Sequence, residues 1–566
     1  MKRTVMVSVG LTMLVSSAAW AQPVVNSVSN ASSYTSDIAQ GSWFVVFGTG
    51  LGPASISVYS GALPFPTDLS GTSISLTPAS GGAVVSARIW YTVASQLAAL
   101  LPSSTAVGAY DLRVSYNSHA SAPKRVNVVA TNFGYATQSQ NGAGPAQATY
   151  GGLDLNRFTT GTLAQYSTRP ARPGDSMILW GTGLGADAAS DLSGGSTGDQ
   201  TAAGKVKVVV GGIEVTPLYA GRSGGSPGLD QINFSVPANV TTGCFVSLQV
   251  KAGGRLSNSG TIAVVPPGQS FCTSGSLTEA QLRKLDQGGT LVAGSLELSK
   301  HTLDMLIPGL GRLQKKSEFV QGAFSRAGVA TVANVAFSAT QIGACTVYQV
   351  SGGASATGSV GGLLDAGLQL SLGGPNASAA IPRDETMVYS ATLYDSGLLG
   401  QGGSGNPTLA QGSYSVTSNG GADIAAFTAK MDFPSDLVWT NEDMADPISR
   451  SAPLTIHWTG GGTGLVQITG TGVTTSTTSA TGALFICTAQ ASAGVFTVPA
   501  SVLQQLPVIT NQGADGDGTV GTLAVMAITD TGKGQGSFSA PLKAGGTTDQ
   551  TFLTYSIGTT KMTGFN

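Results

Sequence analysis

The chain has 566 residues, of which 27 are basic and 29 acidic, and charged residues make up only 10% of it. This balance excludes the basic face with which proteins displace counterions from nucleic acid, and it provides no attraction to an anionic membrane surface. With 79 glycines and few long charged side chains, short strands and tight turns are favoured over long helices, and the length predicts roughly two to four domains.

The first 21 residues have the plan of an export signal. The basic pair Lys2-Arg3 precedes an apolar stretch, Val5–Val15, and an Ala-x-Ala sequence ends at Ala21. The apolar stretch is well short of the about 20 residues that a membrane-spanning helix needs. We therefore expect residues 1–21 to be a signal peptide, the mature protein to begin at Gln22 and to be secreted, and no later segment to cross a bilayer.

From Gln22 to about Val265, short β-branched or alternating runs recur between glycine, proline and asparagine residues. Strands at this spacing predict an all-β sandwich, and the stretch is long enough for two. Pro266-Pro267 ends the last strand, because proline cannot donate to a sheet ladder. Examples of the expected strands are Trp43–Phe47, Ala83–Tyr91, Val206–Val210 and Ile213–Tyr219.

Three sequence blocks occur twice in the same order. Phe47-Gly-Thr-Gly-Leu-Gly52 recurs as Trp180-Gly-Thr-Gly-Leu-Gly185, which places Gly181 133 residues after Gly48. Two further blocks recur at an offset of 135 residues: Gln96-Leu97 as Gln231-Ile232, and Gly108, which precedes a strand, as Gly243. A nearly constant offset predicts a duplicated domain. We place module 1 at residues 22–140 and module 2 at residues 141–270.

A short helix is predicted after module 2. Ser276 and Glu279 have the spacing of a capping box, and leucines follow with helical periodicity up to Gly288-Gly289. We expect a linker helix within residues 271–289 and a β-rich C-terminal domain of one or two units over residues 290–566. The strands expected there are Ala330–Phe337, Leu368–Leu372, Tyr389–Tyr394, Leu454–Trp458, Leu465–Ile468 and Leu523–Ile528.

The repeated blocks resemble a known module. Asn30-Ala-Ser32, Gly41 and Phe47–Gly52 are similar to the opening of a secreted β-sandwich module of large exported proteins from soil bacteria, which resembles IPT/TIG immunoglobulin-like domains. Module 2 matches more fully, between Pro173-Gly-Asp175 and Ser257-Asn258, whereas in module 1 Gln96 is followed by Leu-Ala instead of Ile-Asn. The resemblance covers roughly residues 24–270. It implies two tandem immunoglobulin-like sandwiches and no known catalysis.

Two kinds of glycine-rich motif have the spacing of known functional sites. A dinucleotide site needs a helix directly after the glycines, and no helix is expected after Gly52 or Gly185, so we interpret both motifs as turns and assign no cofactor. Gly221-Arg-Ser-Gly-Gly225 fits the Gly-x-Ser-x-Gly pattern of a nucleophile elbow, which lies between a strand and a helix. A strand is expected from Gln231 onward, so a loop between two strands is the preferred interpretation. A serine hydrolase is the weaker one, and no catalytic residue is assigned.

Histidines and carboxylates give no clear metal site. His119, His301 and His457 are scattered without metal-ligand spacing, and His457, which alternates with Trp458, is expected to be a partly buried sheet residue. Asp515-Gly-Asp517 lacks the closing glutamate of an EF-hand, so whether a metal binds stays open. The densest acidic group could form a glycosidase pair or hold calcium, although we prefer a solvated acidic loop. It consists of Asp436, Glu442, Asp443 and Asp446.

The four cysteines are an even number in a chain with an export signal, which favours two disulfides. Three connectivities are possible. Cys244 and Cys272 flank the last strand pair of module 2, so we predict a Cys244–Cys272 disulfide. Cys345 and Cys487 then pair by elimination, and two free buried thiols are the alternative.

Two functions are consistent with these patterns. The first is a secreted, non-enzymatic binding or structural protein of the cell exterior, in contact with an extracellular glycan or protein surface. A duplicated sandwich without a catalytic constellation favours it, and it involves neither a cofactor nor nucleic acid. The alternative is an extracellular hydrolase with a catalytic C-terminal domain, in which Asp436 and Glu442 are the active carboxylates.

Overall fold

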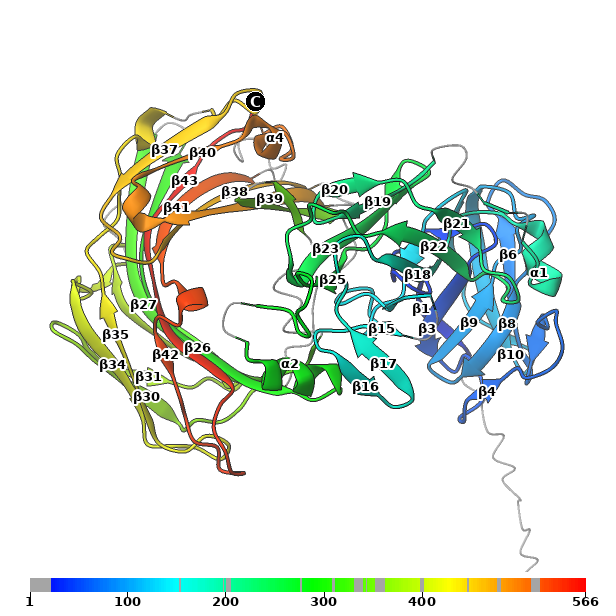
Figure 1. Ribbon diagram of the computed structural model, residues 1–566, viewed down its shortest axis with the longest axis horizontal. Helices are drawn as coiled ribbons and strands as arrows, with labels where there is room; N and C mark the ends of the chain where they lie inside the picture. Colours follow the sequence, from blue (N-terminus) through cyan, green and yellow to red (C-terminus); the bar gives the residue numbers. More distant parts are fainter. Residues whose placement is uncertain are drawn as a thin grey trace, which may run out of the picture.

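The structure is a computed structural model in which two β-sandwiches precede a short helix and a large curved sheet (Figure 1). The expected signal peptide, residues 1–21, lies outside the described residues. The all-β prediction is confirmed. The structure describes residues 22–151, 154–196, 198–199, 205–274, 277–307, 311–329, 339–342, 344–351, 362–397, 402–444, 447–475, 480–509 and 520–566.

Module 1 is a sandwich of two sheets with strand orders β1-β3-β9-β8-β4 and β2-β12-β10-β6-β5. Alternating residues of both sheets fill its core, and Phe44, Ile74 and Leu112 are at most 1% exposed. The strands are β1 (Val24–Asn30), β2 (Ile38–Ala39), β3 (Trp43–Thr49), β4 (Ser57–Val58), β5 (Asp68–Leu69), β6 (Thr72–Pro78), β7 (Val85–Ser86), β8 (Arg88–Val93), β9 (Gln96–Leu100), β10 (Gly108–Tyr116), β11 (His119–Ala120) and β12 (Lys124–Val129).

Module 2 is built in the same way, from a sheet with the order β16-β17-β15-β14-β18-β22-β21 and a sheet with the order β20-β19-β23-β24. Its core is a separate cluster that includes Leu179, Ile232 and Leu248. The strands are β13 (Gly134–Tyr135), β14 (Ala148–Thr149), β15 (Leu155–Asn156), β16 (Gly161–Leu163), β17 (Tyr166–Arg169), β18 (Ser176–Thr182), β19 (Val206–Val210), β20 (Ile213–Val215), β21 (Tyr219–Arg222), β22 (Asp230–Ser235), β23 (Gly243–Ala252), β24 (Arg255–Leu256) and β25 (Gly260–Val264).

The repeated sequence blocks occupy equivalent positions in the two sandwiches. Phe47 of β3 pairs with Gln96 of β9, and in the same register Trp180 of β18 pairs with Gln231 of β22. The repeated glycines begin β10 and β23. Because β13 already pairs with β18 of module 2, we propose that the junction lies at residues 130–133, earlier than residue 140.

One expectation about the glycine motifs is wrong. A short helix, α1 (Ala188–Ser193), begins three residues after Gly185, where the Gly- and Ser-rich sequence predicts a loop. Contacts with module 1 stabilise it, because Asp191 accepts hydrogen bonds from the N–H and hydroxyl of Ser103, at 2.7 and 2.9 Å. A helix of six residues is too short to be stable in isolation, so these tertiary contacts account for it.

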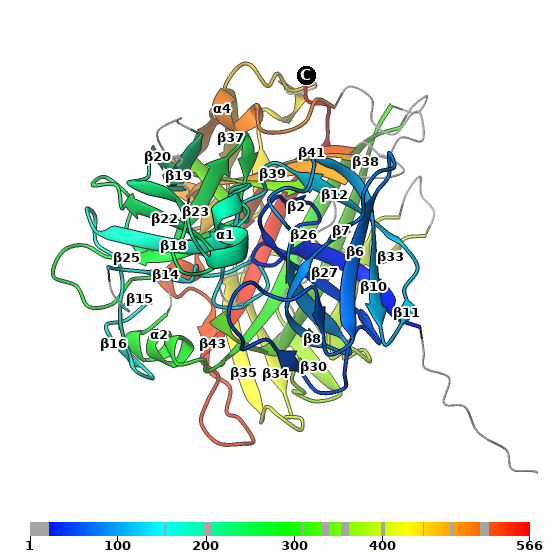
Figure 2. The same ribbon diagram turned by 90° about the vertical axis from the view of Figure 1, so that its right-hand side faces the viewer.

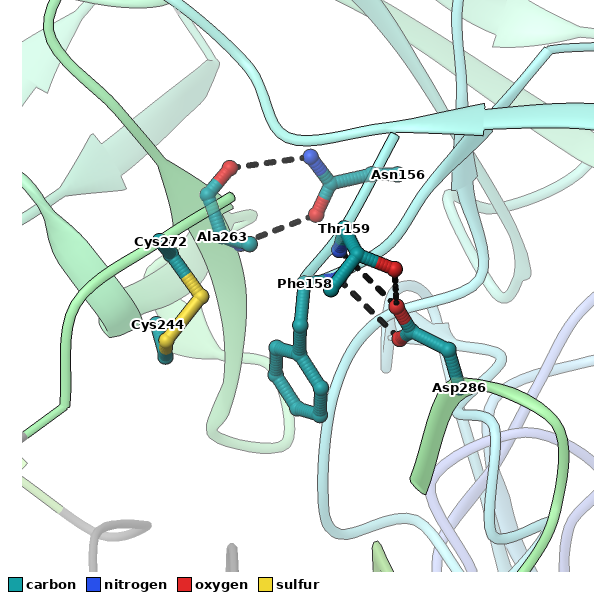
Figure 3. Close-up of a disulfide and its surroundings, with 7 residues drawn as sticks. All are labelled: Asn156, Phe158, Thr159, Cys244, Ala263, Cys272 and Asp286. Carbon is teal, nitrogen blue, oxygen red and sulfur yellow. Dashed lines mark hydrogen bonds between the residues drawn. A yellow bond between two sulfur atoms is a disulfide. The ribbon is translucent and has the colours of Figure 1, made fainter. Parts of the chain in front are cut away.

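Helix α2 (Glu279–Asp286) lies in the expected linker. Its capping box is formed by Thr278 and Gln281 instead of Ser276 and Glu279, and Ser276 is outside the described residues. The helix packs on module 2, and the Asp286 carboxylate accepts the backbone N–H groups of Phe158 and Thr159 beside a disulfide (Figure 3). The linker helix is therefore anchored to module 2.

The C-terminal domain is organised around a strongly curved sheet, which carries smaller sheets on its outer side (Figures 1 and 2). Within the described residues the sheet has 11 strands, and the last strand of the chain, β43, lies parallel to the first strand of the domain, β26. The strand order is β28 (Ala339–Ile342), β29 (Cys345–Ser351), β39 (Ala480–Gln490), β38 (Leu465–Thr475), β41 (Val520–Ile528), β43 (Gln550–Met562), β26 (Leu291–Ile307), β27 (Gly311–Ala327), β32 (Tyr389–Asp395) and β33 (Ser404–Gly405), with β42 (Ser537–Phe538) beside β43.

A single hydrophobic core joins these sheets, and we therefore propose that the C-terminal domain is one unit. The core cluster runs from Val292 to Phe565 and includes residues of the curved sheet and of both smaller sheets. The expected strand Ala330–Phe337 lies outside the described residues. The smaller sheets contain β31 (Ser378–Pro382), β30 (Gln369–Gly373), β34 (Gly412–Ser418) and β35 (Phe427–Phe433), and β36 (Val438–Trp439), β37 (Leu454–Thr459) and β40 (Val495–Val498).

Candidate functional site

The four cysteines form two buried disulfides. Cys244–Cys272 joins the start of β23 to the segment after β25, with the Cα atoms 5.0 Å apart, and it packs with α2. Cys345 and Cys487 face each other on the neighbouring strands β29 and β39, with the Cα atoms 3.9 Å apart. Both pairings are those that the sequence predicts, and each lies within one folded unit.

The predicted acidic cluster is dispersed. Asp436 is exposed and forms an ion pair with Lys300 at 2.9 Å. Glu442 is partly buried, so it does not belong to a solvated loop, and burial together with the neighbouring Asp304 raises the pKa of Glu442 to about 7. Asp443 is exposed. Asp446, like Asp515 and Asp517 of the possible calcium loop, lies outside the described residues.

The histidines remain separate from one another. His119 and His457 are exposed, so the expectation that His457 is partly buried is wrong, because the strand turns Trp458 to the core instead. His301 contacts the Ser556 hydroxyl at 3.1 Å, and burial lowers its pKa. Among the described residues there is no group of three or more His, Cys, Asp or Glu side chains that could hold a metal ion. No helix of the described chain is long and apolar enough to span a membrane.

Modules 1 and 2 are joined by buried hydrogen bonds that involve the second glycine motif. The Thr182 hydroxyl accepts the N–H of Trp43 at 2.9 Å and donates to the carbonyl of Gly228 at 2.7 Å. The Asn30 amide donates to the carbonyls of Asn132 and Thr182 at 2.9 and 3.2 Å. We call this contact region the joint. These bonds fix the position of one sandwich relative to the other.

A pocket of about 540 Å³ opens at the joint. Strands β3, β8 and β9 of module 1 supply one side, and the loop between β21 and β22 of module 2 supplies another. None of the described residues that line it carries a charge. They are Ala31, Ser32, Tyr34, Trp43, Val45, Leu63, Phe65, Trp90, Tyr91, Gln96, Ala98, Gly181, Thr182, Gly225, Ser226, Pro227 and Leu229.

Aromatic rings dominate the side of the pocket formed by module 1. Trp43 packs against Phe65 and Trp90, with ring centroids 5.2 and 5.7 Å apart, and Trp90 packs edge-on against Tyr91 at 5.5 Å. Trp90 is 46% exposed, which is unusual for so large an apolar side chain. It lies at a β-bulge, where the pairing of β8 with β9 shifts between Ile89 and Tyr91. Since Ile89 and Thr92 of this strand are buried, Trp90 lies on the face of the strand that is turned away from the core of module 1.

A strained turn supplies the polar side of the pocket. Tyr34 has a φ of 60°, in the left-handed region that residues with side chains seldom adopt. Buried Asn30 holds this turn, because its backbone carbonyl accepts the Tyr34 N–H at 3.0 Å and its side-chain oxygen accepts the N–H groups of Ser32 and Ser33. The Asn-Ala-Ser motif of the sequence therefore shapes the pocket.

Two further side chains supply hydrogen-bonding groups without charge. The Gln96 amide donates to the Tyr91 hydroxyl at 2.6 Å. Burial raises the pKa of both Tyr34 and Tyr91, so both phenols are neutral at ordinary pH. Together with the rings, they give the lining flat apolar surfaces flanked by neutral donors and acceptors, the usual composition of a small-molecule site.

The Gly-x-Ser-x-Gly segment belongs to this pocket and not to a nucleophile elbow. Arg222 ends β21 and Asp230 begins β22, so residues 223–229 connect two antiparallel strands, as the preferred interpretation predicts. Sequence reasoning missed the pocket itself. Its clearest signal is Trp90, which follows Ile89 in a strand with alternating burial and takes a position where a polar residue is expected.

No family model and no curated protein matches this sequence. The glycan-binding protein SGBP-B of a Bacteroides ovatus mixed-linkage glucan utilization locus is 9% identical, with a TM-score of 0.18, and the alignment covers 63% of this chain and 65% of that protein, just under two thirds of its length. SGBP-B of a complex xyloglucan utilization locus in Bacteroides uniformis is 10% identical, with a TM-score of 0.15. That alignment covers 65% of this chain and 85% of the other protein. The four N-terminal immunoglobulin domains of Dscam1 are 9% identical, with a TM-score of 0.12. That alignment covers 97% of this chain and 100% of the Dscam1 chain. At TM-scores this low, we infer no ligand from these proteins.

Proposed function

We propose that the protein is a secreted, non-enzymatic carbohydrate-binding protein of the cell exterior, and that the pocket at the joint holds a sugar. The observation that carries the proposal is the half-exposed Trp90, which together with Trp43, Phe65 and Tyr91 presents aromatic rings to the pocket. The faces of aromatic rings are electron-rich and attract the slightly positive C–H groups of a sugar ring. The expected signal peptide and the two disulfides fit an oxidising exterior.

The uncharged lining favours a neutral sugar over an acidic one. Binding a uronic acid or a sulfated sugar would transfer an anion into a pocket without a cationic partner among its described lining residues, which costs free energy. Neutral hydroxyl groups can instead exchange hydrogen bonds with Tyr34, Tyr91 and Gln96. A hydrolase role has less support, because Asp436 is engaged by Lys300 and Glu442 contacts a different carboxylate, Asp304.

The test uses the full mature chain in affinity electrophoresis against neutral polysaccharides (glucans, xylans and mannans) and against polygalacturonate. Trp90→Ala removes the exposed ring, and we expect it to weaken binding of the retained glycan by about 30-fold, the equivalent of an interface residue worth about 2 kcal/mol. Leu218→Ala is the matched control, because Leu218 is also exposed (62%) but lies outside the pocket lining.

Three outcomes contradict the proposal. Retention of no glycan at all contradicts carbohydrate binding. Equal retention of wild type and Trp90→Ala places the sugar elsewhere. Release of reducing ends from the retained glycan by the wild-type chain contradicts the non-enzymatic role.

A further inference from the structure

The loop between β21 and β22 is an addition to module 2. In module 1 the equivalent strands, β8 and β9, are connected by Ala94-Ser95 alone, whereas residues 223–229 connect β21 to β22. The three-strand arrangements β3-β9-β8 and β18-β22-β21 are otherwise the same. The extra residues extend to module 1, where four of them line the pocket: Gly225, Ser226, Pro227 and Leu229.

This loop fits closely on Trp43. The Trp43 indole N–H donates to the carbonyl of Pro227 at 2.7 Å. Gly228 adopts a φ of 69°, and a Cβ atom there would lie 2.8 Å from the indole nitrogen and 2.5 Å from Leu100. Since neither contact leaves room for a side chain, any displacement of the loop must also change the surroundings of Trp43.

A buried ion pair closes the base of the loop. Arg222 and Asp230 are directly paired across β21 and β22, and their side chains are 1% and 0% exposed. The Asp230 carboxylate also accepts the Leu184 N–H at 2.7 Å, and the Arg222 guanidinium donates to the carbonyl of Gly185 at 2.8 Å. The pair thus connects both ends of the loop to the second glycine motif.

Two hydrogen bonds donated by backbone N–H groups hold the tip of the same loop on α1 and the glycine that follows it. The N–H of Gly225 donates to the carbonyl of Gly194 at 2.7 Å, and the N–H of Gly228 donates to the Ser190 hydroxyl at 3.1 Å. Both ends and the tip are therefore fixed before a ligand arrives, which is the condition for a pre-organised binding wall.

From these contacts we infer that residues 223–229 set the ligand selectivity of the pocket, and that the Arg222–Asp230 pair positions them. The selectivity role rests on the proposed sugar-binding function. Asp230 and Arg222 act as positioning residues, since neither is part of the pocket lining. Loss of one partner leaves the other as an uncompensated buried charge, which must find water or a new contact, and the loop then moves.

The experiment compares Asp230→Asn with Asp175→Asn in the full mature chain. Asp175 forms the Arg169–Asp175 ion pair of the same module at 2.6 Å, and neither of these residues lines the pocket. One readout needs no ligand: the hydrogen-exchange rate of the Trp43 indole N–H, measured by NMR and assigned with Trp43→Phe. The second readout is the ranking of affinities for cellohexaose, laminarihexaose and xylohexaose.

We expect Asp230→Asn to speed exchange of the Trp43 indole N–H by about tenfold or more, because protection follows the free energy of local opening, and to change the affinity ranking. Asp175→Asn should change neither. Should Asp230→Asn fail to fold, Arg222→Lys decides the question, because it keeps the buried charge but lacks the planar fork that contacts Asp230 and Gly185 together.

Wild-type exchange and wild-type ranking in a folded Asp230→Asn or Arg222→Lys protein would overturn the inference. If the wild-type chain binds none of the three saccharides, the result contradicts both the sugar-binding function and the selectivity role for these three ligands. The exchange measurement then still decides whether the ion pair positions the loop.

Discussion

Removing the two disulfides should destabilise the protein by different amounts. The Cys244–Cys272 disulfide closes a loop with a sequence separation of 28 residues, and the Cys345–Cys487 disulfide closes a loop with a separation of 142 residues. In the chain-entropy relation these separations correspond to about 3.6 and about 5 kcal/mol of unfolding free energy at 25 °C. All four cysteines are at most 1% exposed, so alanine replaces each without burying a polar group. We therefore expect the Cys345→Ala, Cys487→Ala pair to be the more destabilising.

Calorimetry of the full mature chain can follow each effect, because the two disulfides belong to different core clusters. The transition that contains module 2 should shift when Cys244 and Cys272 are replaced, and the transition of the C-terminal domain when Cys345 and Cys487 are replaced. Wild type treated with a reducing agent is the control and should reproduce both shifts. A loss below about 1 kcal/mol in either variant, or a larger loss for the shorter loop, would refute the entropic reasoning. Mapping the linked peptides without reduction checks the pairings themselves.

Two further substitutions test the linker and the buried carboxyl pair. Asp286→Ala leaves the N–H groups of Phe158 and Thr159 without their acceptor, so we expect a loss of about 3 kcal/mol in module 2 and faster proteolysis near α2; unchanged cleavage would contradict the anchoring role. Because the folded-state pKa of Glu442 is raised to about 7 from 4.5, ionisation of this group lowers stability as pH rises across that interval. Glu442→Gln should therefore raise the melting temperature at pH 8 but not at pH 4.5, and an equal effect at both pH values would show that burial and Asp304 do not raise the pKa of Glu442 in the folded state.

The duplicated sandwiches could be predicted because the residues that determine their turns and strand register lie close together in the sequence. The repeated glycines and the aromatic–Gln pairs mark turns and a strand register, and both appear in the sequence as fixed spacings. The long hairpin β26–β27 could not be predicted in the same way. Its 17-residue strands include Gly294 and Gly322 and the Lys315-Lys316 pair, so they lack the short, bounded alternation by which strands are identified. Pairing with neighbours that are distant in sequence decides their structure.

The pocket is also hidden from the sequence, because its lining comes from segments far apart in the chain. Tyr34, Trp43 and Trp90 come from separate segments of module 1, and Pro227 joins them only when module 2 docks on module 1. Each residue has an ordinary local explanation: a turn, a strand, a bulge and a hairpin loop. Only the exposed position of Trp90 on its strand is anomalous locally, and a single anomalous tryptophan cannot identify its partners.

The joint explains why one repeated motif can serve two purposes. In module 1, Gly48 lies against the carbonyl of Val24 within the same sandwich, just as its equivalent Gly181 lies against the carbonyl of Gly134, and Thr49 is exposed. In module 2, Gly183 lies against the carbonyl of Asn132 and the Asn30 side chain, and buried Thr182 bonds to Trp43. The motif supplies the same strand end in both copies, but only the second copy meets a neighbouring sandwich. The binding role that we propose therefore arises from the order of the modules along the chain and from the loop added to the second, not from the motif alone.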